Sequence, residues 1–76
     1  MIIELTDELD EQPIPNEWLV LRMKIARDRL LSASDWTQTN DAPVDQSAWA
    51  TYRQQLRDFP STWEPSETVE FPDPPA

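Results

Sequence analysis

A helical pattern of large apolar residues between positions 49 and 59 constrains this chain more than any other feature. Four residues follow one another at spacings of three, four and three: Trp49, Tyr52, Leu56 and Phe59. That spacing places all four on one face of a helix. Asp45 precedes the pattern as a candidate N-cap, and Pro60 follows it as a helix breaker. The pattern therefore predicts an amphipathic helix over residues 46–58.

A second amphipathic helix is expected over residues 16–33, after a break at Pro13 and Pro15. Asn16 is its candidate cap. Its apolar residues form two adjoining stripes, one of Leu19, Met23, Ala26 and Leu30 and the other of Trp18, Leu21 and Ile25. This helix is longer than the one at 46–58, so antiparallel packing would leave part of it bare. We expect the stripe of Trp18, Leu21 and Ile25 to remain uncovered and to bind a partner.

Together the two helices predict a mainly α fold, a helical hairpin. The connection at residues 34–45 is rich in turn and cap residues, and Ser34 or Asp35 could cap a short turn there. The same connection contains a tryptophan, which polar loops seldom hold unless its ring packs against something. We expect the core of the hairpin to contain Leu30, Trp36, Trp49, Tyr52 and Leu56.

Two extended arms are expected on either side of the hairpin, which spans residues 16–60. Residues 1–15 form an acidic arm whose β-prone residues are Ile2 and Ile3. A strand this short needs a neighbour, so the alternatives are disorder and pairing with the sheet edge of a partner. Residues 61–76 form a Pro-rich extended arm with separated anchors at Trp63, Val69 and Phe71. We expect these arms to bind the partner, and deletion of residues 61–76 to leave the helix content unchanged.

No pattern predicts a catalytic, metal or cofactor site. The chain contains no His and no Cys, which removes the commonest general base, the commonest metal ligand and any disulfide. The acidic stretch at residues 6–12 lacks the glycine and ligand spacing of an EF-hand loop, so solvated carboxylates are predicted. Ser34 and Asp35 have no neighbouring base that would activate a nucleophile. We therefore predict a protein without enzymatic activity or cofactor.

The charge distribution disfavours nucleic-acid binding. The formal net charge is −9, with six carboxylates and no basic residue among residues 1–17. Four of the six basic residues lie between positions 18 and 34. A net negative chain lacks the excess of Lys and Arg that neutralises phosphates, although its acidic arms leave open a DNA-mimic or regulatory role. We find no signal-peptide layout and no apolar run long enough for a membrane span, so a soluble chain made in the cytoplasm is expected.

One stretch of sequence resembles a known family. Residues 27–60 read RDRLLSASDWTQTNDAPVDQSAWATYRQQLRDFP and are similar to the tail assembly chaperone-like family of tailed bacteriophages. The resemblance depends on an ordered series of residues rather than on composition: Arg27, Leu30, Leu31, Ser34, Asp35, Trp36, Thr37, Gln38, Asp41, Ala42, Pro43, Ala48, Trp49, Tyr52, Arg53, Gln54, Leu56, Arg57, Asp58 and Pro60. Residues 1–17 and 61–76 show no comparable counterpart.

The resemblance implies a protein of phage tail assembly. It indicates a non-enzymatic interaction module whose partners are tail, tail-fibre or baseplate proteins, with neither nucleic acid nor membrane as a partner. We expect this module to bind its partner in the host cytoplasm and to be retained in the virion tail as a small structural subunit. The alternative is a transient chaperone that is absent from the mature particle. Whether several copies act in a symmetric assembly is left open.

Overall fold

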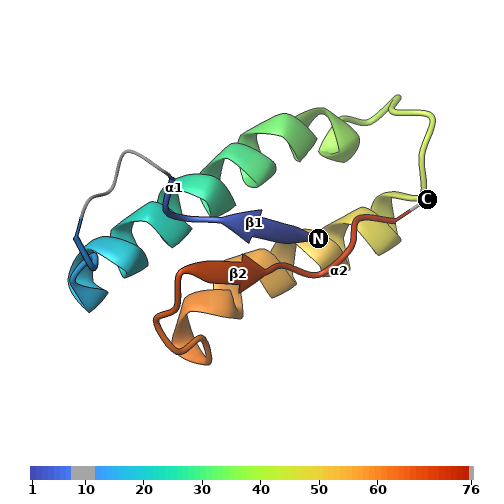
Figure 1. Ribbon diagram of the computed structural model, residues 1–76. Coiled ribbons are helices and arrows are strands. Elements are labelled where there is room, and N and C mark those ends of the chain that lie inside the picture. Colours follow the sequence, from blue (N-terminus) through green and yellow to red (C-terminus); the bar gives the residue numbers. More distant parts are fainter. Residues whose placement is uncertain (8–11, 76) are drawn as a thin grey trace.

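The computed structural model describes residues 1–7 and 12–75, and its helices form the predicted hairpin (Figure 1). Helix α1 runs over Asn16–Ser34 and helix α2 over Gln46–Asp58, so the expected spans 16–33 and 46–58 are confirmed. Each of them is followed by a short 3-10 helix: η1 (Asp35–Gln38) follows α1, and η2 (Phe59–Ser61) follows α2. Residues 8–11, most of the acidic stretch expected to be solvated, lie outside the described part.

The two helices begin differently. Asp45 occupies the N-cap of α2, where its Oδ1 accepts a hydrogen bond from the Ala48 amide at 3.1 Å, as the sequence predicts. The expected capping role of Asn16 is wrong, because Asn16 is already the first helical residue of α1 and Pro15 holds the N-cap position. Pro15 has no side-chain acceptor, so α1 begins without a side-chain cap.

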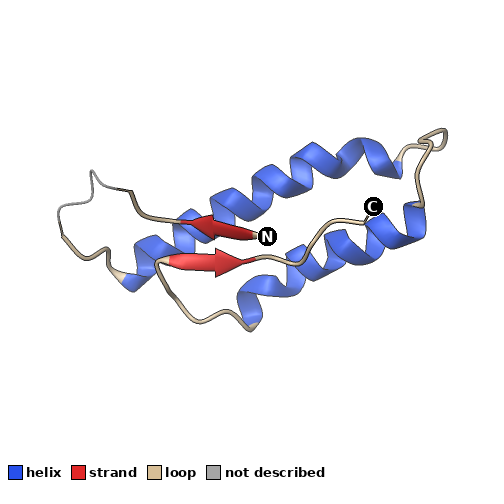
Figure 2. Ribbon diagram, turned by 45° about the vertical axis from the view of Figure 1, so that its right-hand side comes forward, coloured by secondary structure: helices blue, strands red, loops and turns tan. Residues whose placement is uncertain are grey.

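The two arms meet in a small antiparallel sheet on one face of the hairpin (Figure 2). Strand β1 (Ile2–Glu4) pairs with strand β2 (Thr68–Glu70), and Ile3 lies opposite Val69. In both ribbon views β1 lies on the α1 side of the sheet and β2 on the α2 side. The first arm therefore finds its strand partner within its own chain, which corrects the expectation of disorder or of pairing with another protein.

The core is built from both helices and both arms. Among the residues that the structure describes, seven apolar ones are buried: Leu5, Leu19, Met23, Tyr52, Leu56, Val69 and Phe71. Val69 and Phe71, which were expected to be free anchors, are each only 1% exposed. The C-terminal arm thus fills the core between the helices, so deletion of residues 61–76 is expected to destabilise the helices as well. The molecule that results measures 47 × 24 × 17 Å.

The residues expected in the hairpin core lie in or against the core of the structure, except Trp36. Tyr52 and Leu56 are buried, and Leu30 and Trp49 are partly buried against the core. Trp36 is 52% exposed, although its ring centroid lies 6.5 Å from that of Trp49. The reason is local, because η1 turns its fully buried residue, Thr37, towards the interior and leaves Trp36 at the surface.

Candidate partner-binding surface

A buried arginine joins the two helices at the closed end of the hairpin. Arg53 of α2 is 8% exposed, and its Nη1 donates to the Leu31 carbonyl at 2.6 Å and to the Ser34 hydroxyl at 2.7 Å. Its Nη2 donates to Asp35 Oδ1 at 2.6 Å. Charge-assisted hydrogen bonds of this kind are stronger than neutral ones. The hairpin is therefore held by a polar contact as well as by its apolar core.

This arrangement assigns a structural role to residues that were expected to be caps. The Ser34 hydroxyl donates back to the carbonyls of Leu30 and Leu31 and accepts from Arg53, so it does not cap η1. Thr37 Oγ1 in turn donates to the Ser34 carbonyl at 2.6 Å. Sequence reasoning missed Arg53, although it borders the apolar face of its helix. Much of the stretch that carries the family resemblance thus builds the hairpin turn.

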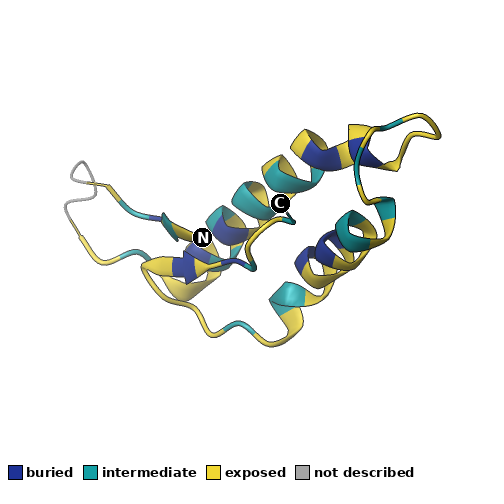
Figure 3. Ribbon diagram, turned by 90° about the vertical axis from the view of Figure 1, so that its right-hand side faces the viewer, coloured by how far each residue is buried: buried dark blue, intermediate teal, exposed yellow. Residues whose placement is uncertain are grey.

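The outward face of α1 exposes three large apolar side chains. Trp18, Leu21 and Ile25 are 55%, 54% and 44% exposed, and we call them the α1 stripe. The opposite face of α1 holds Leu19 and Met23 in the core, so exposed and buried segments alternate along this helix (Figure 3). The expectation that this part of the first helix stays uncovered is confirmed.

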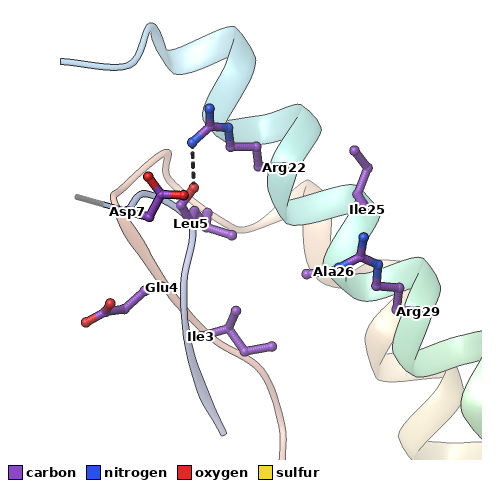
Figure 4. Close-up of a pocket in the computed structure, with 8 residues that line it drawn as sticks. All are labelled: Ile3, Glu4, Leu5, Asp7, Arg22, Ile25, Ala26 and Arg29. Carbon is purple, nitrogen blue, oxygen red and sulfur yellow. Dashed lines mark hydrogen bonds between the residues drawn. The ribbon is translucent and has the colours of Figure 1, made fainter. Parts of the chain in front are cut away.

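A groove lies beside the α1 stripe, between β1 and α1 (Figure 4). It has a volume of about 450 Å³ and is lined by Ile3, Glu4, Leu5, Asp7, Arg22, Ile25, Ala26 and Arg29. At one end Arg22 Nη1 donates to the Leu5 carbonyl at 2.8 Å, which fastens the N-terminal arm to α1. Ile25 belongs both to the stripe and to the groove, so the two features form one continuous surface.

The helical side of this groove is basic in an otherwise acidic chain. Arg29 is exposed and forms no ion pair with any residue in the ranges 1–7 and 12–75. Arg22 lies two turns earlier on the same side of α1. The carboxylates of Glu4 and Asp7 line the other side of the groove, so its basic charge is confined to the α1 side. A partner carboxylate is favoured at Arg29 on that side.

The arm residues expected to bind a partner are placed differently from one another. Ile2 is 68% exposed, whereas Ile3 is partly buried and lines the groove. Trp63 is partly buried against the core, and Val69 and Phe71 lie inside it. Of the residues predicted to bind a partner, the α1 stripe and Ile2 are therefore exposed, whereas Ile3, Trp63, Val69 and Phe71 pack against or within the core.

The buried phenol of Tyr52 has a pKa that departs from its ordinary value. Tyr52 is the sole tyrosine, and burial raises the pKa of its phenol, with the nearby Asp73 carboxylate raising it further. Both causes follow from the packing of Tyr52 in the core. Within the described ranges, no three His, Cys, Asp or Glu side chains gather closely enough to hold a metal ion. None of the helices described is long and apolar enough to cross a membrane.

Comparison with known proteins identifies a family. The model of a family described as phage tail assembly chaperone protein matches residues 20–76. No curated protein and no solved structure matches the chain. The matched segment includes residues 61–76, so the C-terminal arm belongs to the family region, contrary to the expectation from sequence. Strand β1 and Trp18 precede the match.

Proposed function

The chain belongs to the phage tail assembly chaperone protein family, and from this premise we propose that it binds a tail, tail-fibre or baseplate protein directly. A role in tail assembly follows from the family. The proposal adds that the chain acts by binding alone, in the host cytoplasm, and that no catalytic step is involved. It also assigns the binding to the α1 stripe and the adjoining groove.

The observation that supports this proposal is the exposed α1 stripe. The chain uses both of its arms to complete its core, yet it leaves Trp18, Leu21 and Ile25 in water. Adjacent large apolar side chains on the surface of a small protein usually mark an interaction site, and aromatic residues are enriched among the residues that dominate binding. A chain that covers these residues only when it meets its partner is suited to chaperoning.

The packing of the arms also bears on what happens to the chain after assembly. Had the arms been ordered only by neighbours, the protein would be suited to a permanent place in the virion. Instead β1, Val69 and Phe71 complete a core within one chain. A chain that folds alone can exist free, bind and be released, so this packing favours a transient chaperone. Retention as a small structural subunit is the second candidate, and it requires that the chain be present in finished particles.

Two mass-spectrometry measurements test these proposals. Purification of the chain with a C-terminal tag from infected cells should enrich one tail, tail-fibre or baseplate protein in near-stoichiometric amount. Failure to enrich any tail protein would contradict direct binding. Quantification of the chain in purified particles then separates the two fates. Absence supports a transient chaperone, and recovery in fixed stoichiometry supports a virion subunit.

A further inference from the structure

One edge of strand β1 pairs with no residue in the described part of the chain. The Phe71 amide donates to the Met1 carbonyl and the Leu5 amide to the Glu67 carbonyl, both at 2.9 Å, and Ile3 pairs with Val69 between them. The backbone amide and carbonyl groups of successive residues point to opposite edges of a strand. The amide and carbonyl groups of Ile2 and Glu4 therefore point away from β2. No described residue forms a hydrogen bond with them.

The groove lies along this same edge. Its lining comes from β1, the residues that follow it and α1, and includes no residue of β2. A further strand would lie about 4.8 Å from β1, on the side where α1 exposes Ile25 and Arg29. A two-stranded sheet is marginal, and a third strand would extend it over the part of α1 that is now bare. Figure 4 shows the α1 side chains that such a strand would meet.

We propose that a segment of the tail protein adds to β1 as a third strand and lies in this groove. Its backbone pairs with the outward groups of Ile2 and Glu4. On its face towards α1, the added strand carries an apolar side chain that contacts Ile25 and a carboxylate that pairs with Arg29. This inference rests on the proposed function for the identity of the partner, and it specifies how that partner is recognised.

The α1 side of the groove determines which side chains the added strand must carry. Arg29 is exposed beside Ile25 and has no carboxylate partner among the described residues. An Asp or Glu two residues from an apolar residue would lie on the same face of the partner strand and would meet both groups at once. A basic strand would place like charges together, which costs affinity. The segment recognised therefore carries an apolar residue and a carboxylate on the same face, two residues apart.

A second copy of this chain suits the groove less well. Pairing of β1 with its own copy would bring together two chains that each carry a net charge of −9. The two net charges repel one another. A different protein is therefore the occupant. If the purified chain alone forms a dimer that Glu4→Pro abolishes and Glu4→Ala does not, the groove binds a second copy and the inference is wrong.

Proline substitution tests the backbone pairing. The Glu4 amide points away from β2, so Glu4→Pro removes a donor from the free edge and leaves the β1–β2 hydrogen bonds in place. The matched control, Glu4→Ala, removes the same side chain but keeps the amide. Binding of the tail protein by Glu4→Pro should be about fivefold or more weaker than binding by Glu4→Ala. Equal affinities of the two variants would overturn the inference.

Amide hydrogen exchange gives a second readout that does not depend on substitution. In the full chain bound to the tail protein, the Ile2 and Glu4 amides should become protected, whereas the Leu5 amide is already bonded to Glu67 in the free chain. Unchanged exchange at Ile2 and Glu4 in a saturated complex would mean that the partner binds elsewhere. In that case direct binding stands and strand addition fails, so the two proposals are separable.

Charge reversal tests the chemistry of the partner strand. Arg29→Glu should weaken binding by about tenfold. Arg57→Glu, an equal change at an exposed arginine of α2, should leave the affinity unchanged within about twofold. If the two variants weaken binding equally, the effect comes from net charge and the acidic strand is excluded. If the Arg29 variant binds normally, the pairing with Arg29 is excluded.

Discussion

The rings of Phe59 and Phe71 lie 4.9 Å apart and are inclined by 48°. Phe59 begins the short 3-10 helix after α2, whereas Phe71 directly follows β2. This contact packs the C-terminal arm against the end of α2. Phe71 lies in the core and is 1% exposed. A proline-rich segment with the composition of a tail is thereby part of the folded domain.

Phe71→Ala should lower the free energy of unfolding by about 3–5 kcal/mol, because it removes a fully buried aromatic ring and leaves a cavity. Urea denaturation followed by circular dichroism measures this loss. The control is Glu70→Ala on the exposed side of β2, which should change stability by less than about 0.5 kcal/mol. If the two variants were equally stable, the arm would not be part of the core.

Arg53→Lys should destabilise the hairpin by about 2 kcal/mol. Lysine keeps the positive charge but cannot reproduce the planar fork that reaches the Leu31 carbonyl, the Ser34 hydroxyl and Asp35 together. The same denaturation experiment on Arg57→Lys, an exposed site on the same helix, serves as the control and should show almost no change. If Arg53→Lys left the free energy of unfolding unchanged, the positive charge alone, without the planar fork, would join the helices.

The two tryptophans at the hairpin end should respond differently to truncation. Trp49 packs edge-on against Tyr52 at 5.6 Å and is partly buried, so Trp49→Ala should cost about 3 kcal/mol. Trp36 is 52% exposed, so Trp36→Ala should cost about 1 kcal/mol or less. Thermal melting of both variants measures the difference. If Trp36→Ala lowered the melting temperature more than Trp49→Ala, Trp36 would be a core residue after all.

Stability should fall at alkaline pH because of Tyr52. Burial raises its pKa in the folded chain, so the neutral phenol stabilises the fold below the unfolded pKa of about 10. This contribution is lost as the pH rises from there through the folded pKa. Tyr52→Phe should flatten the dependence of the melting temperature on pH between about 9 and 11. The tyrosinate absorbance of this sole tyrosine gives its titration directly. A midpoint at or below the usual value would contradict the buried phenol.

The hairpin was predictable because its signals are local. The spacing from Trp49 to Phe59, the cap at Asp45 and the breaker at Pro60 all lie within a few residues of the helix that they define. The exposed α1 stripe was predictable for a related reason, since the apolar surface of α1 is wider than one facing helix can cover. Local periodicity and length were sufficient for both conclusions.

The arms were not predictable because their partners are distant in sequence. Strands β1 and β2 have three residues each, and more than sixty residues separate them. Nothing local indicates that Ile3 lies opposite Val69. A spaced series of apolar residues in a polar tail looks the same whether it anchors to a partner or to its own helices. Likewise, a buried arginine such as Arg53 has the sequence pattern of a solvated one.

The affinity of the isolated tail protein for an Ile25→Asp variant tests the central claim most directly. Ile25 is exposed in both the α1 stripe and the groove, so a charge there should weaken binding by about 2 kcal/mol or more without unfolding the chain. Gln55→Asp introduces the same charge at an exposed position of α2 and should bind as the wild-type chain does. Normal binding by Ile25→Asp, with loss of binding by Gln55→Asp, would show that the partner docks on the other side of the molecule.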